Sequence, residues 1–163
     1  MNWSTLNSSG DRPVPEASEI VRLCRQRPEA LAALAAVYAD ADAAGAGGLC
    51  LRGGTCCRFD LQPHRLFLTG LELAALAAEA PPRQWAIEQS RRGRCPYQIR
   101  HTCQAYARRP LGCRTFYCGA AARGAEGLHE VFHSRIREIH ENFCIPYAYA
   151  DLCRCFLQLF LVK

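Results

Sequence analysis

Cysteine is the residue that most constrains what this chain of 163 residues can fold into. There are eleven cysteines, an odd number, and seven of them fall into two tight groups within residues 50–57 and 95–118. In a reducing compartment such groups are typical of metal ligation rather than of a disulfide framework. We therefore expect folding to bring the two groups together around a metal. The seven are Cys50, Cys56, Cys57, Cys95, Cys103, Cys113 and Cys118.

The spacing of these cysteines leaves the kind of metal open. Thiolates are soft ligands that select zinc, copper(I) or iron–sulfur clusters. The spacing is neither the paired C-x2-C of zinc ribbons nor the C-x2-C-x2-C of bacterial ferredoxins. We accordingly expect zinc or iron, including an iron–sulfur cluster, with the element undecided.

Not all seven cysteines are expected to bind one ion. Neighbouring side chains tend to point apart, so one of Cys56 and Cys57 is a better ligand candidate than both together. The first four candidates are Cys57, Cys95, Cys103 and Cys113. The others, Cys50, Cys56 and Cys118, follow closely. A buried apolar cysteine is the alternative for each, and it is preferred for Cys24, Cys144, Cys153 and Cys155.

Two arginines lie within the second cysteine group. Four thiolates around Zn²⁺ or around a [4Fe–4S]²⁺ core leave a net charge of about −2. Arg109 and Arg114 are therefore candidates for positions behind the ligands, where a guanidinium group lowers thiol pKa values and offsets that charge. The alternative is a pair of ordinary solvated arginines.

Both cysteine groups resemble a known family. Residues 103–118 read C-x2-Y-x2-R-P-x2-C-R-x-F-x-C, which matches every fixed position in the signature of the CxxCxxCC zinc- or iron-chelating domain, the YkgJ-type cysteine-cluster proteins. Residues 50–57, CLRGGTCC, are similar to the family's C-x2-C-G-x-C-C, but Gly53 replaces its second cysteine. The tail is more weakly similar to that of short bacterial members. The resemblance implies metal chelation without a settled reaction, and the missing cysteine counts against a second metal.

The rest of the chain predicts a small, mainly α, single-domain protein with an irregular cysteine-rich centre and room for a short strand pair. A loose arm over 1–16 is expected to precede one domain over 17–163, with its core motif at 49–118 and C-terminal helices at 127–163. The expected elements are two helices between 16 and 44 divided at Pro28, a short strand within 57–69, a helix starting at the Thr69/Glu72 capping box, a short helix over 83–92, an amphipathic helix over 128–143 and an apolar helix over 145–163.

Composition excludes some functions and disfavours others. The net charge of +5 comes almost wholly from arginine, because Lys163 is the only lysine. No long basic run is present, which counts against nucleic-acid binding. No secretory signal and no apolar run of about 18 residues occur, so we expect a cytoplasmic protein without a membrane span. The apolar C-terminal helix is a candidate surface for a homodimer.

One further motif, HEVFH at residues 129–133, has the H-E-x-x-H pattern of zinc peptidases. His129 falls at the expected helix start and His140 is out of register for a third ligand, so we disfavour this reading. A milder hypothesis adds His133 or His140 to the cysteine site. The leading expectation is a metal-binding protein of undecided biochemical role. The alternatives are an iron–sulfur oxidoreductase or electron carrier and, after these, a zinc-stabilised interaction module.

Overall fold

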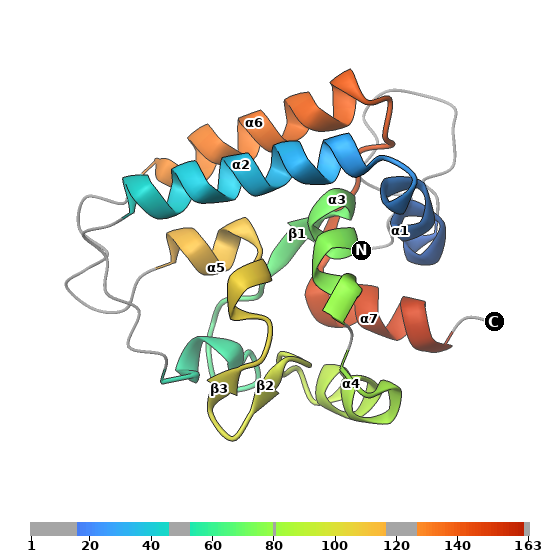
Figure 1. Ribbon diagram of the computed structural model, residues 1–163. Helices are drawn as coiled ribbons and strands as arrows, with labels where there is room; N and C mark the ends of the chain where they lie inside the picture. Colours follow the sequence, from blue (N-terminus) through green and yellow to red (C-terminus); the bar gives the residue numbers. More distant parts are fainter. Residues whose placement is uncertain (1–15, 46–52, 80, 117–126, 162–163) are drawn as a thin grey trace.

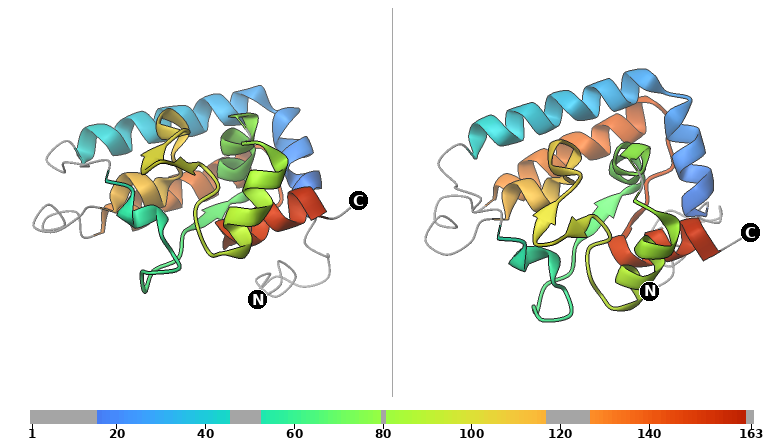
Figure 2. Two further views of the ribbon diagram at one scale, coloured as in Figure 1. Left: turned by 90° about the horizontal axis from the view of Figure 1, so that it is seen from below. Right: turned by 60° about the horizontal axis from the view of Figure 1, so that its bottom comes forward.

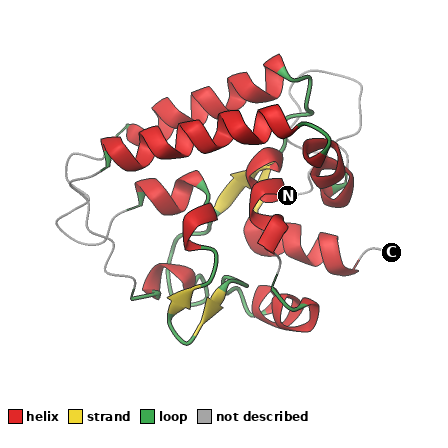
Figure 3. Cartoon of the chain, in the orientation of Figure 1, coloured by secondary structure: helices red, strands yellow, loops and turns green. Residues whose placement is uncertain are grey.

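A computed structural model describes residues 16–45, 53–79, 81–116 and 127–161. Residues 1–15 of the arm expected over 1–16, Cys50 and Cys118 therefore lie outside the described residues. The fold is mainly α, as predicted, with two short antiparallel strand pairs (Figures 1 and 3). The helices are α1 (Ala17–Arg25), α2 (Pro28–Ala44), α3 (Gly70–Leu76), α4 (Arg83–Arg91), α5 (Leu111–Thr115), α6 (Leu128–Asn142) and α7 (Leu152–Leu161), with 3-10 turns η2 (Thr55–Cys57), η3 (Ala77–Glu79) and η4 (Tyr106–Arg108). The strands are β1 (Phe67–Thr69), β2 (Gln98–Ile99), β3 (Thr102–Cys103) and β4 (Tyr149–Asp151).

The two longest helices, α2 and α6, run side by side in opposite directions along one side of the molecule (Figure 1). Pro28 occupies the first helical position of α2, where its missing N–H leaves no hydrogen bond unmade. On α6 the predicted apolar face is confirmed: Phe132, Ile136 and Ile139 are buried, and Leu128 packs against the core. The apolar side chains of these two helices cover α3 and α5.

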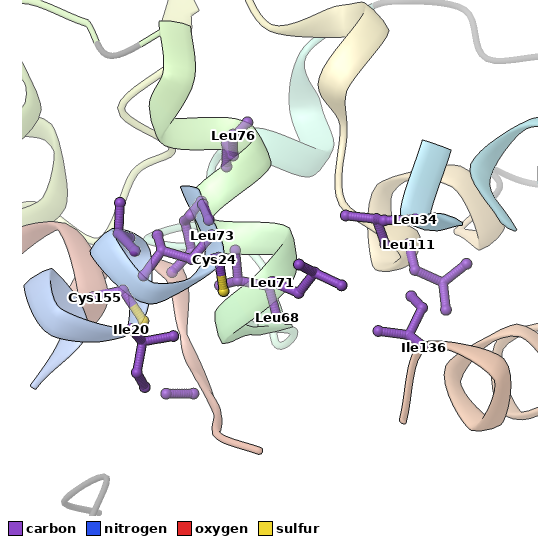
Figure 4. Close-up of a cluster of buried hydrophobic side chains, with 14 of the residues drawn as sticks. Ile20, Cys24, Leu34, Leu68, Leu71, Leu73, Leu76, Leu111, Ile136 and Cys155 are labelled. Carbon is purple, nitrogen blue, oxygen red and sulfur yellow. The ribbon is translucent and has the colours of Figure 1, made fainter. Parts of the chain in front are cut away.

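The core lies beneath α2 and α6, and Figure 4 shows part of it. Leu34, Leu111 and Ile136 come from α2, α5 and α6 and are each almost fully buried. On the other side, α1 packs closely on the start of α3. A Cβ at Gly70 would lie 2.3 Å from Cγ2 of Ile20, so this approach requires glycine. The core thus connects elements from both ends of the chain.

The prediction of a C-terminal helix over 145–163 is wrong about where the helix begins. Residues 149–151 form β4, which pairs with β1 in the register Leu68↔Ala150, and the helix begins only at Leu152. The apolar pattern of residues 145–163 did not reveal this strand. It forms because the backbone groups of β1 need hydrogen-bond partners, and the local sequence does not show which segment supplies them. Asp151 then accepts a hydrogen bond from the backbone N–H of Arg154 at 3.0 Å, which caps the first turn of α7.

The segments that carry Cys56, Cys57, Cys95 and Cys103 lie at the edge away from α2 and α6, whereas Cys113 is in α5, which packs against both helices. In the views of Figures 1 and 2, η2 and the β2–β3 hairpin lie side by side at that edge. Two hydrogen bonds join them: Cys95 N–H donates to the carbonyl of Cys57 at 2.9 Å, and the Gln98 side-chain amide donates to the carbonyl of Gly54 at 2.7 Å. The first cysteine group is thereby tied to the second through the main chain.

The predicted capping box at α3 is present and fully buried. The hydroxyl of Thr69 accepts from the backbone N–H of Glu72 at 3.3 Å, and the Glu72 carboxylate accepts from the backbone N–H of Thr69 at 2.8 Å. The same carboxylate also accepts from Leu111 N–H at 2.7 Å and from the Tyr38 hydroxyl at 3.3 Å. Glu72 therefore joins α3 to the first turn of α5 and to α2.

This carboxylate is only 1% exposed. Burial raises the pKa of Glu72, while the hydrogen bonds from Thr69, Leu111 and Tyr38 counteract part of the rise. Without the carboxylate, buried backbone N–H groups at the start of two helices would lack a partner.

We expect Glu72→Ala to lower the free energy of unfolding by about 3 kcal/mol, because buried donors would be left unpaired and a cavity opened. Chemical denaturation measures this. Glu138→Ala is the matched control, since Glu138 is exposed on α6, and it should change stability by less than about 0.5 kcal/mol. Equal effects of the two variants would contradict the role given to Glu72.

Candidate metal centre

Five of the predicted ligands line a single cavity of about 420 Å³. The cavity is bounded by η2, the β2–β3 hairpin, α5 and the β1–β4 pair. Members of both cysteine groups reach it from segments that are far apart in the sequence. These members are Cys56, Cys57, Cys95, Cys103 and Cys113.

A glycine shapes the turn that presents the first group. Gly54 has φ of +70°, in the left-handed region that favours glycine. A Cβ at this position would lie 2.4 Å from the side-chain nitrogen of Gln98 and 2.6 Å from the carbonyl oxygen of His101. The CLRGGTCC segment therefore requires glycine at position 54 for η2 to lie against the β2–β3 hairpin.

The neighbouring thiols change one another's pKa values. Cys57 is in hydrogen-bonding contact with both Cys56 and Cys95. The contact with Cys57, together with burial, raises the pKa of the Cys56 thiol. For Cys57 the bond with Cys56 lowers the pKa, but the bond with Cys95, burial and the neighbouring thiols raise it further than that. Burial followed by repulsion from Cys57, Cys56 and Cys103 raises the pKa of Cys113. The raised pKa values keep these groups as neutral thiols, and a bound cation would favour their thiolate forms.

In the described part of the chain, no three His, Cys, Asp or Glu side chains are arranged closely enough to hold a metal ion. The donor chemistry thus fits a soft metal, whereas a closed set of ligands is not formed by the described residues alone. The cysteines for which a buried apolar role was preferred lie off the cavity wall. Cys24, Cys153 and Cys155 are buried as expected, but the expectation is wrong for Cys144, which is exposed.

Arg109 lies on the cavity wall. Its guanidinium group stacks 3.8 Å from the centre of the Tyr106 ring, and it donates to the carbonyl oxygens of Tyr106 at 3.1 Å and Cys113 at 3.4 Å. Its positive charge acts to lower the pKa of both Cys56 and Cys113, although the bond with Cys57 and burial outweigh it at Cys56 and burial outweighs it at Cys113. The role predicted for Arg109 behind the ligands of a metal stays a prediction.

Arg114 faces away from the cavity wall. Its side chain is 4% exposed, lies 4.1 Å from the Tyr38 ring centre and forms an ion pair with Asp42. It also donates to the carbonyl oxygens of Arg109 and Ala107, each at 2.7 Å. Arg114 therefore fastens the loop before α5 to α2. The sequence motif gave no signal for its partners Tyr38 and Asp42, which lie more than 70 residues earlier.

The two histidines of the H-E-x-x-H pattern have separate partners. Nδ1 of His129 lies 3.2 Å from the Thr115 hydroxyl, and Nε2 of His133 lies 2.8 Å from the Tyr147 hydroxyl. The two rings stack with centroids 5.5 Å apart, while Glu130 is exposed. His129 lines the cavity, and no third ligand joins the pair among the described residues.

His133 and His140, which the sequence offered as additional ligands, are not on the cavity wall. His140 is 1% exposed at the end of α6, with Nδ1 3.3 Å from the carbonyl oxygen of Ile145. Its Nε2 is buried and has no hydrogen-bond partner within the described residues. Desolvation lowers the pKa of His140 to about 4.

Sequence reasoning missed the aromatic part of the wall. Six phenylalanine and tyrosine side chains from several elements surround the cysteines: Phe59, Phe67, Tyr97, Tyr106, Phe116 and Tyr149. His64 completes this surface, with its ring 4.8 Å from that of Phe116 and Nε2 3.1 Å from the carbonyl oxygen of Cys56. Only Tyr106 and Phe116 belong to the cysteine signature, so no local pattern indicated the others.

Comparisons of the chain with known protein families, curated proteins and solved structures found no match. Among the described helices, none is long and apolar enough to cross a membrane.

The buried His140 makes stability depend on pH. The proton binds the unfolded chain near the ordinary pKa of 6.5 and the folded chain only near 4, so stability from the neutral ring is complete above pH 6.5 and falls between these values. By pH 5 the loss should reach about 2 kcal/mol. The test is to measure the free energy of unfolding of wild type and His140→Gln at about pH 7.5 and about pH 5. A pH slope that is identical in the two proteins would contradict it.

Proposed function

We propose that this protein binds a soft metal, zinc or iron, through thiolates of the cavity cysteines. The observation that carries the proposal is the convergence of five cysteines from separate segments on one cavity wall, with Cys57 in contact with both Cys56 and Cys95. Buried cysteines in an apolar core need no such gathering. Three further buried cysteines of this chain, Cys24, Cys153 and Cys155, stay apart from the cavity.

Electrostatics support the same proposal. The bond with Cys57 and burial raise the pKa of the Cys56 thiol, and burial and repulsion from neighbouring thiols raise that of Cys113. A bound cation reverses both effects, since it stabilises thiolates directly. Arg109 adds a fixed positive charge beside them, and its hydrogen bond to the Cys113 carbonyl keeps it there.

The proposed ligand set follows from these positions. Cys57, Cys95, Cys103 and Cys113 stay the first candidates, with Cys56 as the alternative to its neighbour. Cys50 and Cys118 are further candidates, and within the described residues no three donors lie close enough together to hold an ion. The resemblance to the YkgJ-type cysteine-cluster family supports the same residues.

The metal that is bound decides the role of the site. Zinc would cross-link the cysteine segments, whereas an iron–sulfur cluster would carry an electron. The proposal includes a reducing, cytoplasmic location, because thiols there stay free to bind metal.

Elemental analysis tests the proposal directly. The protein is purified without oxygen and without a metal-chelating tag, and zinc, iron and acid-labile sulfide are measured together with the visible spectrum. We expect zinc without colour, or iron and sulfide with absorbance at about 400 nm. Cys57→Ser and Cys103→Ser should each lower the bound metal at least about tenfold after dialysis, because each removes a ligand.

The matched control is Cys144→Ser, which removes an exposed thiol away from the cavity and should retain wild-type metal content. Circular dichroism confirms that each variant is folded. Folded wild-type protein without metal would overturn the proposal, and so would full metal retention by both cavity variants.

A further inference from the structure

The cavity beside the cysteines is much larger than a metal requires. A thiolate lies about 2.3 Å from a bound zinc ion, so an ion with its ligands fills a small volume. The cavity of about 420 Å³ falls in the range of sites for small organic molecules. The remaining space is therefore a separate feature that metal binding does not explain.

The wall of this space is mostly apolar and aromatic. Tyr97 is fixed by a 2.7 Å hydrogen bond from its hydroxyl to the carbonyl oxygen of Leu76, and at 2% exposed it is a rigid part of the wall with almost no surface free for a ligand. Phe67 and Phe116 also line the cavity but are 40% and 49% exposed. Large apolar side chains exposed at a cavity mouth are typical of a surface that an apolar ligand covers.

Charge narrows the kind of ligand. The described residues of the wall include Arg65, Arg109, His64 and His129 but no aspartate or glutamate. Arg65 lies at the mouth, 67% exposed, and within the described residues it forms one ion pair, with Asp151 at 3.7 Å. That contact is longer than a normal hydrogen bond, so it does not engage the guanidinium N–H groups closely. A rim whose arginine is only loosely paired with a carboxylate favours an anion.

We propose that this cavity binds a small organic anion with an aromatic or aliphatic body, such as a hydrophobic carboxylate. The body lies against the exposed rings of Phe67 and Phe116. The acid group lies at the rim, toward Arg65. This inference goes beyond metal binding and does not depend on it, because the aromatic wall and the rim are formed by other side chains than the thiols.

The test compares two fluorescent probes that share an apolar body and differ in charge: anilinonaphthalene sulfonate, an anion, and phenylnaphthylamine, which is neutral. Each is titrated into the full-length protein as purified, and metal content is measured on the same sample. We expect saturable binding of both probes and at least about threefold tighter binding of the anion. The anion should also raise the thermal unfolding midpoint, as a ligand of the folded state does.

Two variants and two matched controls locate the binding. Phe116→Ala should weaken both probes about three- to tenfold, because part of the ring surface is lost. Leu61→Ala, which removes an exposed apolar side chain off the wall, should leave both unchanged. Arg65→Gln should weaken only the anion, by about two- to fivefold for an exposed charge. Arg22→Gln, on the exposed face of α1, should have no effect.

The inference is overturned if neither probe binds saturably, if the anion lowers the unfolding midpoint, or if Phe116→Ala and Arg65→Gln bind both probes as wild type does. The two proposals fail separately. Metal-free protein that binds the anion contradicts the metal site alone, and metal-loaded protein that binds neither probe contradicts the anion site alone.

Discussion

The buried carboxylate of Glu72 is the interaction on which the arrangement around the cysteines depends. One side chain accepts hydrogen bonds from the starts of α3 and α5 and from Tyr38 of α2. Desolvating a carboxylate is costly, and only several well-placed donors offset that cost. Here the donors are fixed by helices, so the position of the carboxylate and the positions of the helices determine each other.

The other end of α5 is held by a second buried charge. Arg114 donates to two carbonyl oxygens in the loop before α5, stacks on Tyr38 and pairs with Asp42. Glu72 and Arg114 thus both reach α2, from opposite ends of a helix of five residues. So short a helix has little stability of its own. These contacts hold Cys113 in a defined position at the cavity wall. The short helix α5 could not hold it there by itself.

The parts of the fold that were predictable are those with a local signal. Thr69 and Glu72 stand at the spacing of a capping box, Pro28 marks a helix start, and the apolar period of α6 identifies its buried face. The start of α7 was not predictable in this way. β4 forms because β1, some 80 residues earlier, offers unpaired backbone groups, and periodicity within 145–163 cannot report that.

The same division applies to the candidate site. Clustering of cysteines in the sequence indicated that they would meet, and five of them line one cavity. The direction of Arg114 toward Asp42, and the aromatic wall with Tyr97 and Tyr149, depend on contacts between distant segments. A signature that covers residues 103–118 holds no information about those partners. The signature predicts which side chains are candidate metal ligands, but it does not predict the residues that surround them.

X-ray absorption spectroscopy at the zinc and iron edges of the anaerobically purified protein is the most direct test of the central claim, because it reports the element and its ligands together. The account predicts a metal surrounded mainly by sulfur at about 2.3 Å. A metal bound only by nitrogen or oxygen at about 2.0–2.1 Å, as the histidine pair on α6 would give, would contradict the claim that the cysteines hold it.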